Sequence, residues 1–101
     1  MKLRKMKISD LEELYALWKQ AGLSVASFEK EKKEVEMMIE LYPDSCLVEL
    51  DNNKIIGSIL GVFNGRRAWI YHLAIHPSFQ KRGLGSMLLK KAQIALKKVG
   101  A

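Results

Sequence analysis

The sequence predicts an α/β fold of the α+β type, with a mixed sheet and the element order β-α-α-β-β-β-α. Two observations support this prediction. Up to Pro43 the apolar residues recur at helical spacing, whereas from Ser45 to Ile75 they form short runs rich in Ile and Val, as in strands. Helical spacing then returns near the end of the chain. The 101 residues contain no linker, repeat or low-complexity segment, so a single domain is expected over 1–101.

The N-terminal half is predicted to contain one short strand and two helices. Residues 3–8 alternate in character and are expected to form the strand. Ser9 opens a Ser-x-x-Glu capping box, and Gly22 is placed to end the first helix. The second helix is expected to begin near Ser27 and to stop at Pro43. Its apolar stripe is predicted to be Phe28, Val35, Met38, Ile39 and Tyr42.

Three strands and a final helix are predicted next. The strands are expected at residues 45–50, 54–63 and 68–75, and the helix at 86–99. Asn64-Gly65 is expected to form a type I′ hairpin turn, since both central positions of that turn need a positive φ. Pro77 follows the third of these strands and ends it, because proline cannot donate to a sheet ladder.

Charge is distributed unevenly along the chain. All eleven acidic residues lie between Asp10 and Asp51, and the first 51 residues contain eight Lys and Arg residues, which leaves them at −3. The remaining fifty residues carry nine cations and no anion, or +9. This asymmetry favours a polyanionic partner for the second half, although a solvated lysine face would look the same. A phosphorylated cofactor, nucleic acid and a membrane surface are the candidate partners at this point.

Cellular location is predicted from three features. No apolar run approaches the ~20 residues of a membrane-spanning helix, and Lys7 and Asp10 interrupt any signal peptide. The single Cys46 cannot form an internal disulfide, and its apolar strand predicts a buried, unreactive thiol. A cytoplasmic protein without membrane association is therefore expected. Cys46, His72 and His76 lack metal-ligand spacing, so no metal site is predicted.

The glycine-containing loop before the last helix is predicted to bind phosphate. The first amides of a helix have no internal partners, and Gly83 and Gly85 allow them to approach an anion closely. Lys81 and Arg82 add positive charge at the same place. A Walker loop is excluded because no lysine follows Gly85. A dinucleotide fingerprint is excluded because Leu88 stands where its third glycine is required.

The same loop carries a family resemblance. Gln80-x-x-Gly83-x-Gly85, preceded by Leu73-Ala74-Ile75-His76-Pro77, resembles motif A of the GCN5-related N-acetyltransferases (GNAT), whose signature is Gln/Arg-x-x-Gly-x-Gly/Ala. The element order matches that family from its first strand through its third helix, so the resemblance covers nearly all of the chain. It implies an acetyl-coenzyme A-dependent N-acetyltransferase acting on a primary amine. Relatives continue with a fifth strand and further elements, so the domain is expected to be truncated.

The resemblance also implies which residues bind coenzyme A. Loop amides would hold the pyrophosphate, and the main chain of Leu73 and Ile75 would pair with the pantetheine arm. An amide near Leu73 would stabilise the oxyanion formed from the thioester. The expected cofactor-binding residues are Leu73, Ile75, Gln80, Lys81, Arg82, Gly83, Leu84, Gly85 and Ser86.

Tyr71 and His72 are the candidate catalytic residues. Some relatives carry a glutamate base on the fourth strand, and here these two are its only titratable side chains. Histidine titrates near neutral pH and suits general-base work, but a packing or hydrogen-bonding role for His72 stays open, as does a core or cleft-wall role for Tyr71. Trp18 and residues 23–28 fall where relatives build the acceptor wall, or they are simply core and loop. The amine acceptor itself is not predicted.

Two other functions and one assembly complete the expectations. The chain could be a non-catalytic coenzyme A-binding module that needs a partner chain or a further segment for activity. Nucleic-acid binding is disfavoured, because the basic residues are not interleaved with aromatics and no known motif appears. Without a fifth strand the fourth strand presents an unpaired edge, so a homodimer through that edge is expected.

Overall fold

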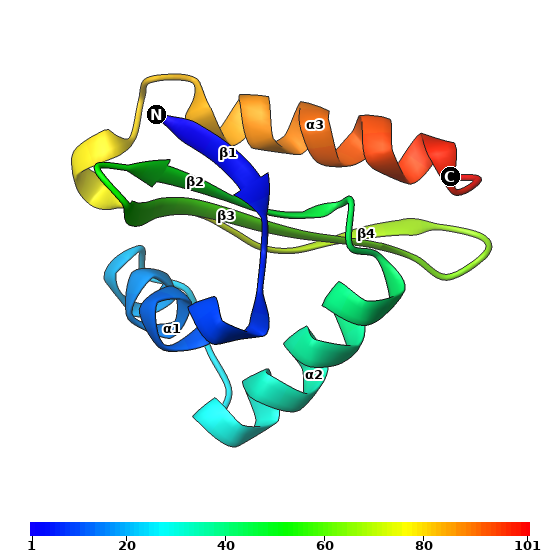
Figure 1. The fold of residues 1–101 in the computed structure, drawn as a ribbon, viewed down its shortest axis with the longest axis horizontal. Coiled ribbons are helices and arrows are strands. Elements are labelled where there is room, and N and C mark those ends of the chain that lie inside the picture. Colours follow the sequence, from blue (N-terminus) through cyan, green and yellow to red (C-terminus); the bar gives the residue numbers. More distant parts are fainter.

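The computed structural model describes all residues from Met1 to Ala101 and confirms the predicted order of elements. These elements are β1 (Lys2–Lys5), α1 (Leu11–Gln20), α2 (Phe28–Leu41), β2 (Cys46–Asp51), β3 (Lys54–Phe63), β4 (Ala68–Ile75) and α3 (Leu84–Lys98), as shown in Figure 1. Short 3₁₀ turns precede α1 at Ile8–Asp10 and follow β4 at Pro77–Phe79. The bounds of β3 and β4 are those predicted, and α3 begins two residues earlier than expected.

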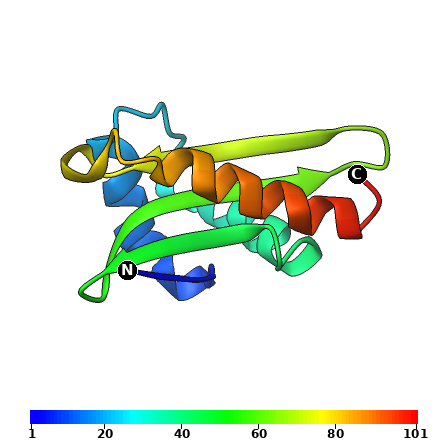
Figure 2. The same ribbon diagram turned by 90° about the horizontal axis from the view of Figure 1, so that it is seen from above.

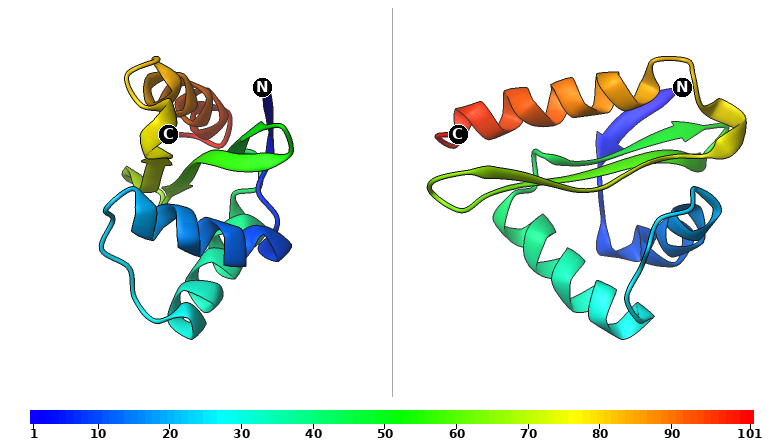
Figure 3. Two further views of the ribbon diagram at one scale, coloured as in Figure 1. Left: turned by 90° about the vertical axis from the view of Figure 1, so that its left-hand side faces the viewer. Right: turned by 180° about the vertical axis from the view of Figure 1, so that it is seen from behind.

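The elements form three layers around one sheet. The strands lie in the order β1-β2-β3-β4, and every neighbouring pair is antiparallel. Helices α1 and α2 cover one face of the sheet and α3 covers the other (Figures 1 and 3). Seen from above in Figure 2, α3 runs along the length of the strands. Because β4 has a neighbour on one side only, its other edge is open.

Both faces of the sheet carry an apolar layer. On the side of α1 and α2 the buried cluster includes Trp18, Val35 and Val48, and on the side of α3 it includes Leu47 and Leu88. Neighbours in β2 thus pack into different layers, as the pleat of a strand buried on both faces requires. Helix α1 gives four residues to the first layer, and Val35, Phe28, Met38 and Ile39 of the predicted α2 stripe pack in or against it.

The start of α1 differs from the prediction. No hydrogen bond from Ser9 caps the helix, so the predicted capping box is wrong. Instead, the Asp10 carboxylate accepts from the amide of Lys7 at 2.8 Å and from both terminal nitrogens of Arg4 at 2.8 and 2.9 Å. A charged acceptor with three donors outcompetes a neutral hydroxyl at this position.

The predicted type I′ turn at Asn64-Gly65 is also wrong. Gly65 has a φ of 95°, but Asn64 has no positive φ. The side-chain oxygen of Asn64 instead accepts from the amides of Arg66 and Arg67, both at 3.0 Å. The pair of positive φ values that such a turn needs occurs at Asn52 (51°) and Asn53 (65°), between β2 and β3.

A bulge interrupts β4 at His72. Ser58 and Leu60 of β3 lie opposite Ala74 and Tyr71, so β4 contains one residue more than β3 over this stretch. His72 has a φ of 46°, in the left-handed region. As a result the adjacent side chains of Tyr71 and His72 line the same cavity, which regular alternation along a strand would prevent.

Candidate functional site

A cavity of about 270 Å³ lies where the loop after β4 meets the N-terminus of α3. Seven of the nine residues expected to bind the cofactor line it: Ile75, Gln80, Lys81, Gly83, Leu84, Gly85 and Ser86. The other two lie outside its lining. The Arg82 guanidinium lies 5.2 Å from the centroid of the Phe79 ring, and Leu73 is half-exposed on the edge strand.

The loop is tied to β4 by one side-chain hydrogen bond and leads into the N-terminus of α3. The Gln80 side chain donates to the carbonyl of Ile75 at 3.0 Å and ties the loop to the end of β4. The first hydrogen bond of α3 runs from the amide of Met87 to the carbonyl of Gly83. The amides of residues 84–86 therefore have no partner inside the helix, and they lie at the positive end of its dipole.

The two loop glycines leave open space. A Cβ at Gly83 would meet nothing within 4 Å, and one at Gly85 would meet only the Ile75 side chain, at 3.8 Å. Internal packing therefore does not require Gly85. Lys81 and Arg82 form no ion pair with any carboxylate of the chain. Free amides, free cations and unobstructed approach together suit a phosphorylated ligand.

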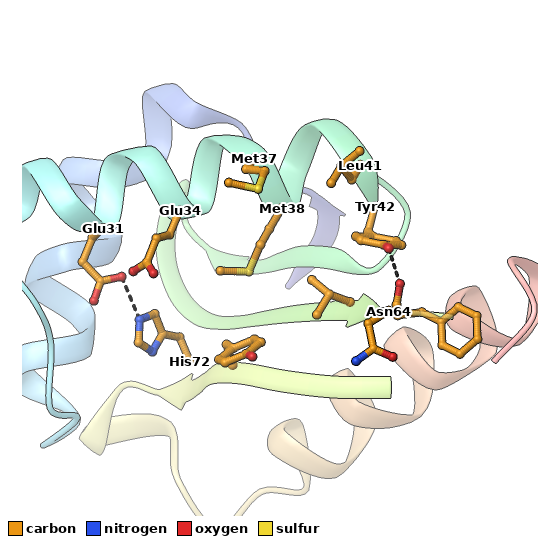
Figure 4. A pocket seen from close by; sticks show the side chains of 11 residues that line it. Glu31, Glu34, Met37, Met38, Leu41, Tyr42, Asn64 and His72 are labelled. Atoms are coloured by element: carbon orange, nitrogen blue, oxygen red, sulfur yellow. Dashed lines mark hydrogen bonds and ion pairs between the residues drawn. The ribbon is translucent and has the colours of Figure 1, made fainter. Parts of the chain in front are cut away.

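A second cavity, of about 350 Å³, lies between α2 and the strands β3 and β4 (Figure 4). Its polar end is formed by Glu31, Glu34 and His72. Its remaining lining residues are mostly apolar: Met37, Met38, Leu41, Tyr42, Val62, Phe63, Asn64 and Tyr71. The Tyr42 hydroxyl donates to the carbonyl of Phe63 and joins α2 to β3 at the far end.

Glu31 and His72 form a hydrogen-bonded pair at the polar end. His72 Nε2 lies 2.9 Å from Glu31 Oε1, and the other carboxylate oxygen accepts from the amide of Ala26 at 3.0 Å. Glu31 is only 4% exposed. An ionised carboxylate can only accept, so the bond assigns the proton of the ring to Nε2. In the neutral ring the lone pair is then on Nδ1, which has no hydrogen-bond partner in the chain and is not fully buried.

Trp18 and Ser58 stabilise the bulge through two consecutive hydrogen bonds. Trp18 Nε1 donates to Ser58 Oγ at 2.9 Å, and the Ser58 hydroxyl donates to the carbonyl of His72 at 2.9 Å. The Trp18 and His72 ring centroids are 4.3 Å apart. Trp18 is fully buried, so of the two interpretations of this residue the core one is correct. No residue of the 23–28 segment lines the cavity, although Ala26 positions Glu31.

Sequence reasoning missed Glu31. The residue lies four positions before Val35, on the apolar stripe of α2, and both are buried. A carboxylate inside an apolar helical stripe is the signal that could have found it, because such a group is buried only when it is partnered. Tyr71, by contrast, was predicted; it is 43% exposed beside His72.

Some further expectations can be compared with the structure. Cys46 is fully buried, and burial raises the pKa of its thiol to about 11. None of the helices has the length and apolar character needed to cross a membrane. The structure contains no group of three or more His, Cys, Asp or Glu side chains that could hold a metal ion.

Comparison with solved structures places the fold among known ones. PaiA N-acetyltransferase from Thermoplasma acidophilum, in complex with coenzyme A, superposes with a TM-score of 0.80 at 23% identity, over 98% of this chain and 73% of that one. Naa20 from Chaetomium thermophilum, in complex with a bisubstrate analogue, gives 0.81 at 18% identity, over 100% of this chain and 58% of that one. At such identities the likeness concerns the fold.

Sequence comparison gives the family. An acetyltransferase of Pectobacterium atrosepticum is 29% identical over 93 residues, which are 92% of this chain. The match spans 65% of the length of that relative. The model of the acetyltransferase (GNAT) family matches residues 8–101, and this match includes the loop, the bulge and both cavities described above. The chain therefore belongs to the GNAT acetyltransferase family.

Proposed function

We propose that this domain binds acetyl-coenzyme A and transfers the acetyl group to a primary amine. The observation that carries the proposal is the open cavity at the N-terminus of α3, with free amides and two unpaired cations. The family of the chain and the coenzyme A named for the PaiA structure support the class of cofactor.

The cofactor residues have distinct roles in this proposal. The amides of residues 83–86 hold the pyrophosphate, and Lys81 and Arg82 balance its charge. The main chain of Leu73 and Ile75, on the open edge of β4, pairs with the pantetheine arm as a further strand would. Gln80 keeps the loop in register with the end of β4 through its bond to the Ile75 carbonyl.

The chemistry requires a place for the two protons that a protonated primary amine loses. His72 accepts the first at Nδ1, since its Nε2 proton is donated to Glu31. Bound acetyl-coenzyme A would supply a thioester, whose carbonyl carbon gains a bond to the amine nitrogen as the carbon–sulphur bond breaks, and the second proton goes to the departing thiolate. An amide near Leu73 donates to the carbonyl oxygen as negative charge develops there. Tyr71 lies next to His72 and contacts the acceptor.

Calorimetric titration with acetyl-coenzyme A tests the cofactor site. Gly85→Val places a side chain in the open space before the free amides and is expected to abolish binding. Gln93→Val introduces the same side chain at an exposed position of the same helix, away from the free amides, and should bind like the unaltered chain. Failure of the folded, unaltered chain to bind, or unchanged binding by Gly85→Val, would overturn the proposal. Binding without thiol release in the presence of amines would favour the non-catalytic binding module instead.

We also propose a homodimer formed through the open edge of β4. The edge is apolar and exposed: Trp69 and Tyr71 are 42% and 43% exposed, and Ile70 is 36% exposed. These residues precede the bulge, whereas the main chain proposed to pair with pantetheine follows it. Pairing along the first half of β4 therefore leaves the cofactor edge free.

A further inference from the structure

We infer that the cavity between α2 and the bulge of β4 selects a primary amine that carries one positive charge and an apolar body. This inference rests on the proposed function and names the class of acceptor that the function leaves open. It is argued from the charges, the apolar wall and the size of the cavity.

At the charged end of the cavity, the carboxylate of Glu34 has no partner within the chain. Both oxygens of Glu31 are occupied, by His72 and by the amide of Ala26. Glu34 is exposed, lines the same end and forms no hydrogen bond or ion pair within the chain (Figure 4). A primary amine is protonated at neutral pH, so its ammonium group finds its counter-ion in Glu34. His72, at the same end, then removes one proton at Nδ1, and the second proton goes to the departing thiolate.

The middle of the cavity is apolar and unfilled. Met37 is 58% exposed and Leu41 62% exposed, and Met38 and Tyr71 line the cavity with them. Exposed apolar side chains that gather in a concave surface mark a binding site, and unbranched methionine adapts to the shape of its ligand. The acceptor therefore carries an apolar group on its amine.

The far end of the cavity excludes a second charge. Tyr42 and Phe63 are joined there by a hydrogen bond, and the only polar side chain beside them is the neutral amide of Asn64. The second ammonium of a polyamine would lie among these groups without a counter-ion, which is costly. A volume of about 350 Å³ lies at the small end of the range of roughly 300–1,000 Å³ for small-molecule sites, so the apolar body is compact.

Ligand binding in this cavity can be measured from the NMR shifts of the methionine methyl groups in the 101-residue chain. Met37 and Met38 line it, whereas Met6 lies in the core and Met87 on α3, so the latter two serve as internal references. The probes are 2-phenylethylamine, its neutral counterpart 2-phenylethanol, and spermidine. We expect 2-phenylethylamine to shift the methyl signals of Met37 and Met38 only, and the other two probes to shift them far less at equal concentration.

Two glutamine variants separate a specific contact from bulk charge. Glu34→Gln is expected to weaken the binding of 2-phenylethylamine by about threefold, in line with an exposed ion pair. Glu36→Gln removes the same charge from the same helix, at an exposed position outside the cavity, and should leave binding unchanged. Unperturbed signals of Met6 and Met87 will show that both variants are folded.

Several results would overturn the inference. These are equal shifts from spermidine or 2-phenylethanol, shifts that spread to Met6 and Met87, and an equal loss of affinity in both glutamine variants. Absence of any shift at Met37 and Met38 would also overturn it. The titration is run with and without coenzyme A, and acetyl-coenzyme A binding is measured separately. Failure of the cavity to bind the amine is thus distinguished from failure of the loop to bind the cofactor.

Discussion

Asp10 and Glu49 are buried carboxyl groups whose surroundings shift their pKa values in opposite directions. Burial raises the pKa of Glu49, whose Oε2 has no hydrogen-bond partner. Burial also acts on Asp10, but hydrogen bonds from Arg4 and from the amide of Lys7 outweigh it and lower the pKa of that carboxyl. The two residues therefore make stability depend on pH with opposite signs.

Thermal unfolding of Glu49→Gln and Asp10→Asn between about pH 2 and pH 8 tests this contrast. The raised pKa means that folding favours neutral Glu49, so its contribution is lost as pH rises through the folded pKa. Glu49→Gln should therefore be more stable than the unaltered chain at neutral pH, by a margin that shrinks on acidification. Asp10→Asn should be less stable at neutral pH, and its deficit should vanish as pH falls through the lowered pKa. Shifts of the same sign in both variants would contradict the assignment.

Strands β3 and β4 show what local sequence can determine. Their bounds were predicted because each Ile- and Val-rich run is closed by residues that end strands, such as Asn64 and Pro77. The bulge in β4 was not predictable in this way. It is held by Trp18 and Ser58, which are distant in sequence, and a positive φ is too uncommon in histidine for the sequence to place one at His72. Glu31 was missed as the partner of His72 for the same reason, since their contact joins α2 to β4.

The contact between α2 and the bulge of β4 fixes the tautomer of His72. Nitrogen-15 shifts of the imidazole rings should show a protonated Nε2 and an unprotonated Nδ1 in the unaltered chain. In Glu31→Gln the side-chain amide both donates and accepts, so His72 should populate both tautomers. His76 provides the control, because its Nδ1 accepts from the amide of Ser78 in either chain.

The same variant separates a positioning role of Glu31 from a structural one. With an active acceptor, Glu31→Gln should lower kcat at least tenfold while the KM for acetyl-coenzyme A stays unchanged. A mixed His72 tautomer with unaltered kcat would show that His72 is not the base. An unchanged tautomer would show that Glu31 does not orient it.

At the scale of the whole molecule, the open edge of β4 is the proposed dimer interface. Light scattering over a range of concentrations tests this homodimer. The expected mass is that of two chains of 11.5 kDa. Ile70→Lys adds a charge to the exposed edge of β4 and should give the monomer, because charged residues block pairing between edge strands. Lys54→Glu changes an exposed charge in β3 and serves as the control. A monomer at every concentration would refute the assembly.

The position of the helices on opposite faces of the sheet also gives the molecule an electric field. Helix α2 carries five glutamates against three lysines, whereas α3 carries four lysines and no acidic residue. Cationic amines are attracted to the face covered by α2 and polyphosphates to the face covered by α3, before either reaches its binding site. The two proposed reactants thus approach by separate routes and do not compete for one entrance. Because both encounters are steered by charge, raising the ionic strength should slow the capture of both together.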